Sequence, residues 1–465
     1  MFQITLSILI LFLSSHVHAS FSDAERLYET RGNRFQIAKE LIEGGYHFTA
    51  TPMIKETVFR QLAGGEDTAK TVENLIYQVG LKQFEPLPEQ TLLSLDSPAV
   101  NFILAKKYFR KKEYKKALKQ IQRINSDNFF YPVAKFVEGS IYTIDKKLKP
   151  ALNSYKLCIS SSVSSISDAR TESRKFQLEF NRDNCIVGKA RTLFALKKYD
   201  QANLAYLDLP KRSFIWPEVL FEEAWNSFYR KNYNRTLGKL ITYRSPLLSY
   251  IYNPNVSVLQ ALTYYEMCLY EDAKREIESF YDGNMQPARR MRLILRRLGK
   301  DYRKYFNLAL LRTKKKTGYG GLFDKTLKAV TKEPTYQELI NYFKKAMDEY
   351  RQVKTKPNSR FKRFVTSNLA EALRLQRDIT GAYVRSRMLE KYTKLYQAFQ
   401  EMSYIKLEIL QKKKFKLYKR EVVGSNKRGD VKYIKRNEKQ YFWDFNHEFW
   451  ADELGDYVFA LKSEC

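Results

Sequence analysis

Histidine and cysteine are scarce in this chain of 465 residues, which contains four of each. Two histidines lie in the apolar N-terminal segment, so His47 and His447 remain for a site elsewhere. The pair His447-Glu448 lacks the second histidine of a metalloprotease helix, and neither the cysteine spacing nor the histidine supply suits a zinc site. We therefore expect no metal and no cofactor.

The motifs of nucleotide-dependent and nucleophilic enzymes are also missing, because we find no nucleophile elbow and no dinucleotide fingerprint. The glycines in Thr317–Gly321 follow three lysines but lack the lysine-hydroxyl ending of a phosphate loop. We interpret this segment as a turn between helices. Glu448, Asp452 and Glu453 are interpreted as the wet face of an amphipathic tail. The sequence predicts a protein that is not an enzyme.

Acidic residues are in deficit, with 51 Asp and Glu against 82 Lys and Arg, and the net charge is +31. A strongly basic chain attracts polyanions, although the charges can equally form a solvated face that keeps the protein soluble. The basic residues concentrate in the second half of the chain. We predict a basic patch made of Arg289, Arg290, Arg292, Arg296, Arg297, Lys412, Lys413 and Lys414.

Long apolar runs are absent except at the N-terminus. Residues 3–14 are almost wholly apolar or hydroxylic, no charged side chain precedes Asp23, and the run ends in Val17-His18-Ala19. This pattern predicts a signal peptide over residues 1–19 that is cleaved after Ala19. The alternative is an uncleaved anchoring helix, but about a dozen apolar residues are too few to span a bilayer.

Export determines which partners we expect. The protein should work in the periplasm or on the periplasmic face of the outer membrane, where nucleic acid is not an expected partner. Anionic lipid, lipopolysaccharide, cell-wall polymers and acidic envelope proteins are the polyanions that such a chain meets.

Five stretches of the chain repeat the same residue classes at nearly the same spacing. A first small residue occurs at Ala105, Gly139, Ala190, Ala224 and Ala261. A second small residue occurs at Ala117, Ala151, Ala202, Thr236 and Ala273. Between them stand the large residues Tyr114, Leu148, Tyr199, Tyr233 and Tyr270. The second small residues are 34, 51, 34 and 37 positions apart, so the register holds apart from two insertions, which we expect in loops.

This spacing resembles the tetratricopeptide repeat, a pair of antiparallel helices about 34 residues long. The resemblance implies an all-α fold, a superhelical solenoid followed by long C-terminal helices. We expect degenerate helical pairs over 20–96, five repeats over 97–281 with a flexible serine-rich insertion at 159–184, a basic helical region over 282–420, and a basic linker and aromatic tail over 421–465.

One helix should be unusually long. After Lys356-Pro357-Asn358, helical sequence continues to about Tyr418 without proline, and its apolar positions fall at heptad spacing. We interpret it as a capping helix packed on the repeats, with an intermolecular coiled coil as the alternative. The oligomeric state stays open.

Four cysteines in an exported chain favour pairing. Cys158 and Cys185 flank the serine-rich insertion at helix ends that should be neighbours, so we predict a disulfide between them. We interpret Cys268, beside Met267 and Leu269, as a buried free thiol within a helix. The state of Cys465 stays open.

The C-terminal tail is rich in aromatic residues, among them Trp443, Phe449 and Trp450. Aromatic side chains are strong interface anchors. The tail should therefore fold back onto the repeats or insert into a partner.

A narrower resemblance covers about residues 212–281 and 441–461. The runs FIWPEVLFEEAWNSFY and FWDFNHEFWADELGDYVF are similar to a group of exported tetratricopeptide-repeat proteins of gliding and predatory deltaproteobacteria. The resemblance implies a role in assembling an envelope or motility machine. We hypothesise a protein-binding scaffold whose groove is lined by Lys106, Arg110, Lys189, Arg191, Asn226 and Tyr265, with a basic cell-wall or lipopolysaccharide binder as the alternative.

Overall fold

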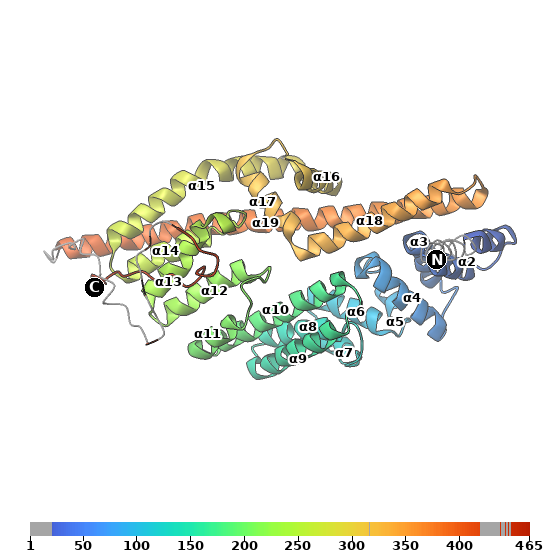
Figure 1. Ribbon diagram of the computed structural model, residues 1–465, viewed down its shortest axis with the longest axis horizontal. Coiled ribbons are helices and arrows are strands. Elements are labelled where there is room, and N and C mark those ends of the chain that lie inside the picture. The colour runs from blue at the N-terminus through green and yellow to red at the C-terminus, as the bar shows by residue number, and fades with distance from the viewer. Residues whose placement is uncertain (1–20, 316, 419–437, 439–441, 443–444, 446–447) are drawn as a thin grey trace, which may run out of the picture. The chain divides into compact units, whose positions relative to one another are not determined.

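The computed structural model describes residues 21–315, 317–418, 438, 442, 445 and 448–465 (Figure 1). Among these residues every regular element is a helix, which confirms the predicted all-α class. The predicted signal peptide and Trp443 lie outside the described residues. The chain divides into two compact units, unit 1 up to Ala169 together with Thr335–Ala382, and unit 2 from Arg170 to Pro334 together with Tyr383–Cys465.

Unit 1 begins with helical residues 21–29. Its further elements are α2 (Arg34–Glu43), α3 (His47–Phe59), α4 (Gly65–Val79), the 3-10 turn η1 (Leu81–Gln83), α5 (Glu89–Leu93), α6 (Pro98–Arg110), α7 (Tyr114–Ile121), α8 (Tyr131–Ile144), α9 (Leu148–Ser167), α18 (Pro334–Thr355) and the first part of α19 (Arg360–Tyr418). Val365, Leu369 and Ala372 of α19 are buried in the same core as α2 to α8. The start of α19 therefore packs on helices of its own chain, as the capping interpretation requires.

Unit 2 contains α10 (Glu172–Ala195), α11 (Tyr199–Leu207), α12 (Trp216–Tyr229), α13 (Tyr233–Ile241), the 3-10 turns η2 (Thr242–Arg244) and η3 (Pro246–Leu248), α14 (Asn255–Glu266), α15 (Tyr270–Leu298), α16 (Tyr302–Lys314), α17 (Gly321–Lys332) and the second part of α19. Phe280 of α15 packs against Phe399 of α19 with ring centroids 5.1 Å apart. Arg385 of α19 donates to the carbonyl of Gly299 at the end of α15, at 2.7 Å.

The five repeated stretches form five helix pairs, which we call copies 1 to 5. The copies are α6–α7, α8–α9, α10–α11, α12–α13 and α14–α15. The large residue of each copy is the first residue of its second helix. Both small residues of every copy are buried. The reason is visible at Gly139, where an added Cβ would lie 2.8 Å from the ring of Tyr155 on the paired helix.

All five copies also share one turn. Two residues after the first helix ends, the backbone is left-handed, with φ between 58° and 62°, at Lys112, Lys146, Lys197, Lys231 and Cys268. In copy 1 the amide of Glu113 donates to Tyr108 O and that of Lys112 donates to Phe109 O. The same two bonds occur in the other four copies, and they define a Schellman C-cap. Glycine usually fills this position because an L-residue there costs about 1–2 kcal/mol.

The serine-rich insertion corrects one expectation. Instead of a flexible loop, most of residues 159–184 are helical, because α9 runs on to Ser167 and α10 starts at Glu172. The hydroxyl of Ser161 donates to the carbonyl of Leu157, four residues earlier, at 2.7 Å. Serine tolerates a helix interior when its hydroxyl is satisfied in this way. The insertion therefore lengthens the helices of copies 2 and 3.

Candidate functional site

The C-terminal tail, residues 448–465, is bound to copies 4 and 5 of its own chain. Its backbone amide at Phe459 donates to the carbonyl of Asn234 on α13 at 3.0 Å, and its amide at Glu464 donates to the carbonyl of Met267 at 2.9 Å. We call the receiving surface the tail site. It is made of Lys211, Trp216, Leu220, Asn234, Gly238, Thr242, Met267 and Cys268.

Gly238, inside α13, lets the tail backbone approach. A Cβ at this position would lie 1.7 Å from the carbonyl oxygen of Tyr457 and 2.7 Å from the Cα of Val458. Backbone atoms cannot give way as a flexible side chain can, so no other residue fits here while the tail is bound. Glycine in a helix interior costs about 1 kcal/mol relative to alanine, and close backbone contact is a reason to tolerate that cost.

Polar groups on α13 and at the start of η2 fix the register of the tail. The side-chain amide of Asn234 donates to the carbonyl of Leu461 and accepts from the amide of Leu461, both at 3.0 Å. One helical turn beyond Gly238, the buried hydroxyl of Thr242 accepts from the amide of Gly455 at 3.0 Å. These bonds recognise the main chain of a segment that is neither helix nor strand, through its backbone and not its side chains.

An apolar contact and an ion pair complete the docking. Gly455 has φ +90°, and a Cβ on it would lie 3.2 Å from both Leu220 and Trp216 of α12. Leu454 beside it is buried, with 6% of its surface exposed. Lys211 donates to Asp456 Oδ2 at 2.8 Å and also to the carbonyl of Asp452. One acid of the tail, Asp456, therefore pairs with a lysine of the tail site.

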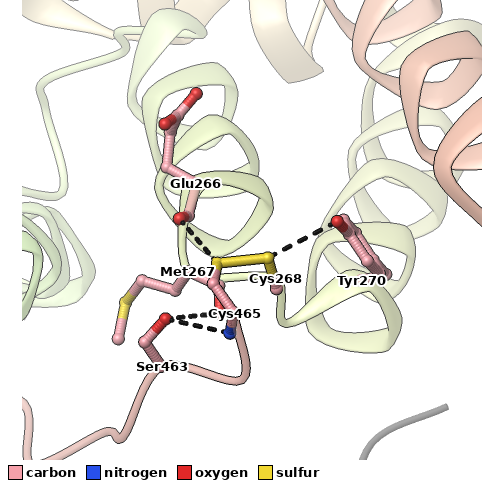
Figure 2. The surroundings of a disulfide bond; sticks show 6 residues. All are labelled: Glu266, Met267, Cys268, Tyr270, Ser463 and Cys465. Carbon is pink, nitrogen blue, oxygen red and sulfur yellow. Dashed lines mark hydrogen bonds between the residues drawn. A yellow bond between two sulfur atoms is a disulfide. The ribbon is translucent and has the colours of Figure 1, made fainter. Parts of the chain in front are cut away.

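A disulfide between Cys268 and Cys465 locks the end of the tail onto copy 5 (Figure 2). The interpretation of Cys268 as a buried thiol within a helix is wrong. Cys268 is the left-handed turn residue of copy 5, where copies 1 to 4 have an exposed lysine. A side chain at this position points out of the hairpin and can reach the tail. Ser463 donates to the carbonyl of Met267 at 3.2 Å beside the bond.

The remaining two cysteines are oxidised as well. Cys158 and Cys185 are both disulfide-bonded, and none of the four cysteines is free. They belong to different units, and their bond to each other stays a prediction.

The tail aromatics cluster with one another. The ring of Phe449 lies 5.2 Å from that of Phe445 and 5.7 Å from that of Tyr457. Burial raises the pKa of the Tyr457 hydroxyl. Trp450 stays 59% exposed, so it does not anchor the tail to the tail site. The contacts that do so come from Asp452 onward, whereas the sequence interpretation had chosen Trp443, Phe449 and Trp450 as the anchors.

The predicted groove residues of copy 1 are engaged within the chain. Lys106 and Arg110 both pair with Glu85, at 3.1 and 3.0 Å. Burial by itself raises the pKa of this carboxyl, but Lys106, Lys82 and Arg110 outweigh it and hold the pKa at about 2. These two side chains therefore stabilise the contact between α6 and the segment after η1.

The groove residues of the later copies differ in exposure. Lys189 pairs with Asp208 at 3.2 Å, and Arg191, whose side chain is 58% exposed, pairs with Glu222. Tyr265 is half-buried, and its pKa is raised by burial and by Glu408. Asn226 is a correction, because it is fully buried and donates to the carbonyl of Tyr199 at 3.0 Å. It holds copy 3 to copy 4 and cannot line a groove.

The predicted basic patch lies on two helices. The arginines Arg289, Arg290, Arg292, Arg296 and Arg297 are all exposed on α15, and none has a carboxylate partner among the described residues. No acidic residue occurs in the sequence between Asp282 and Asp301. On α19, Lys412 and Lys414 are exposed, whereas Lys413 pairs with Glu271.

A shallow groove that sequence reasoning missed lies between α15 and α19. Its volume is about 760 Å³, and its lining residues are Glu278, Tyr281, Asp282, Met285, Ser403, Lys406, Leu407 and Leu410. Leu407 and Leu410 are 62% and 55% exposed. The heptad pattern of α19 had drawn attention to other positions of that helix.

Comparisons with known proteins do not identify a function for any of these surfaces. No protein-family model matches this chain, and a search of curated proteins finds no significant match. None of the described helices combines the length and apolar character needed to cross a membrane. The described residues hold no cluster of three or more histidine, cysteine or acidic side chains arranged for a metal ion.

Proposed function

We infer that this protein is a non-enzymatic interaction scaffold, exported to the bacterial cell envelope. The observation that carries the proposal is the repeated helix pair, with the same turn and the same buried small residues in five copies. A helix pair of this kind cannot bury its apolar stripe alone, and stacking such pairs produces extended surfaces that bind partners. The tetratricopeptide resemblance and the predicted signal peptide support the scaffold role and the envelope location.

The partners we propose are envelope proteins of an envelope-spanning or motility assembly. The resemblance of residues 212–281 and 441–461 to exported proteins of gliding bacteria supports this choice. Lys189 and Arg191 on α10 are the groove residues that remain best placed to receive a partner, because both keep part of their surface exposed.

Photo-crosslinking in intact native cells tests the scaffold. A photoreactive residue is placed at Arg191 in the proposed groove, and a matched one at Leu204 on the outer face of α11, which is 65% exposed. The proposal expects one or a few defined envelope proteins bound at Arg191 and absent at Leu204. Equal, diffuse labelling at both positions contradicts it.

A second candidate function is binding to an anionic wall polymer or lipopolysaccharide. The arginines of α15 favour it, because they form an exposed row that has no carboxylate partner among the described residues, and such a row attracts polyanions. Purified protein should then sediment with cell-wall sacculi or lipopolysaccharide, and less so as salt rises. Arg289, Arg292 and Arg296 changed to alanine should abolish sedimentation. The exposed lysines Lys115, Lys119 and Lys149, changed in the same way, remove equal charge and should leave it intact.

A further inference from the structure

The tail site has the properties of a peptide-binding site. Most of its hydrogen bonds are made with the tail backbone, among them those at Gly455, Phe459, Leu461 and Glu464. Its selectivity comes from the gap at Gly238, the close approach of Gly455 to α12, and the pairing of Lys211 with Asp456. Proteins that bind a peptide segment commonly gain affinity from hydrogen bonds to its main chain and specificity from contacts with a few of its side chains.

The tail site is also particular to one copy. Along the outer face of the second helix and the turn η2 that follows it, copy 4 presents Asn234, Gly238 and Thr242. The residues one repeat earlier are Asp200, Leu204 and Asp208, and they are exposed. Copies 1, 2 and 5 have Lys119, Asn153 and Arg275 where copy 4 has Gly238, and all three are exposed. Copy 4 alone among the five is shaped to receive a chain.

All the described contacts come from a short stretch of the tail. The tail site therefore recognises the sequence of that stretch, whether it belongs to the same molecule or to another copy of the chain. The tail is tethered to α19 through residues 419–447. A chain of that length reaches at most about 100 Å. The tether favours the molecule's own tail by raising its local concentration. Until the disulfide has formed, another copy of the same segment competes for the same contacts.

We propose that the tail site also accepts the tail of a second copy of this chain, so that copies become joined by Cys268–Cys465 disulfides between molecules. The ligand is the tail segment of that second copy, in which the turn Leu454-Gly455-Asp456 carries the acid that pairs with Lys211 and residues 457–465 follow without helix or strand. Closing the bond removes two electrons and two protons from the two thiols. A disulfide oxidant such as oxidised glutathione accepts them through a mixed disulfide and leaves as thiol. The proposal goes beyond the scaffold function and does not depend on it.

Two full-length variants test this exchange. Cys268→Ser keeps the tail thiol, and Cys465→Ser keeps the thiol of the tail site, so neither can close the bond within one molecule. The two are refolded together at equal concentration in a glutathione redox buffer. We expect a covalent heterodimer on a non-reducing gel, with a Cys268–Cys465 peptide in its digest. Absence of that peptide overturns the proposal.

A matched variant separates docking from random oxidation. Gly238→Ala in the Cys465→Ser molecule closes the gap for the Tyr457 carbonyl, while alanine favours the helix itself. Heterodimer yield should fall at least tenfold. Asn234→Ala, which removes two bonds to Leu461, should lower it several-fold. Unchanged yield with Gly238→Ala, in protein of normal helical content by circular dichroism, refutes recognition by the tail site.

Discussion

Copies 3 and 4 share the same turn between their two helices, but the outer face of the second helix is exposed in copy 3 and covered by the tail in copy 4. Each pairs two helices through a left-handed lysine, Lys197 or Lys231, and each begins its second helix with tyrosine. Yet Leu204 of copy 3 is 65% exposed, whereas Gly238 at the matching position of copy 4 lies under the tail. Positions that hold a helix pair together are kept alike, and positions on its outer face are free to become a binding site.

The largest expected effect follows from giving copy 4 the leucine of copy 3. Gly238→Leu should expel the tail, because even a Cβ there meets the Tyr457 carbonyl. The free energy of unfolding should fall by about 4–6 kcal/mol, from the lost disulfide and the exposed Leu454. Urea unfolding measures this change, and maleimide labelling should find two free thiols. Leu204→Gly is the control and should cost about 1 kcal/mol. Two similar losses would refute the contrast between the copies.

A second contrast concerns a buried ion pair. Lys239 on α13 pairs with Glu223 on α12 at 2.6 Å, with side chains 11% and 5% exposed. Lys239→Ala should cost about 3–5 kcal/mol, because it leaves a buried carboxylate without its partner. In copy 3 the pairing of Lys189 with Asp208 is more exposed, so Lys189→Ala should cost less than about 1 kcal/mol. Thermal unfolding of both variants measures the difference.

Removing the disulfide alone separates the stabilisation by the Cys268–Cys465 bond from the stabilisation by the non-covalent contacts of the tail. Cys465→Ser should lower the free energy of unfolding by about 2–4 kcal/mol. The hydrogen bonds to Asn234 and Thr242 remain, so the amides of Leu461 and Gly455 should stay protected from hydrogen exchange. Cys268→Ser should cost the same, and the double variant no more than either. Additive losses would show that the two cysteines act separately.

The side chain of Asn234 provides a smaller test. Asn234→Ala removes two hydrogen bonds to Leu461 and should cost about 1–2 kcal/mol. Asp200 is the matching residue of copy 3, and its side chain is 84% exposed. Asp200→Ala should change stability by less than about 0.5 kcal/mol. Denaturant titrations of both variants decide whether the outer face of copy 4 has a special role.

The smallest expected effect concerns the left-handed turn that copies 3 and 4 share. Lys197→Gly and Lys231→Gly should each stabilise the protein by about 0.5–1 kcal/mol, because glycine adopts left-handed backbone without strain. Melting temperatures should rise by similar amounts in the two variants. A rise in one and a fall in the other would mean that the two turns are not equivalent.

The parts of the fold that repeat could be predicted from sequence, and the parts that occur once could not. The small residues and the tyrosines at helix starts, such as Tyr199, set the register because every copy must bury the same stripe. The long helix from Arg360 also follows from local pattern. The helical path of residues 159–167 did not, since a serine run is typical of loops until hydroxyl–carbonyl bonds are counted.

The tail site was predictable in principle, because copy 4 differs from the other copies at several positions of one face. Asn234, Gly238 and Thr242 depart together from the exposed residues that the other copies have on this face. That signal says a backbone comes close but does not say which one. The partner of Cys268 depends on the path of the tail, which is a long-range contact and leaves no local pattern.

The bond between residues 268 and 465 closes a covalent ring over a sequence separation of 197. Tension applied along the chain bypasses everything inside that ring, so α16, α17 and the tail cannot be stretched while the disulfide holds. Reduction would release about 700 Å of extended chain. In an oxidising compartment, a pulling force therefore cannot extend the part of the chain between residues 268 and 465.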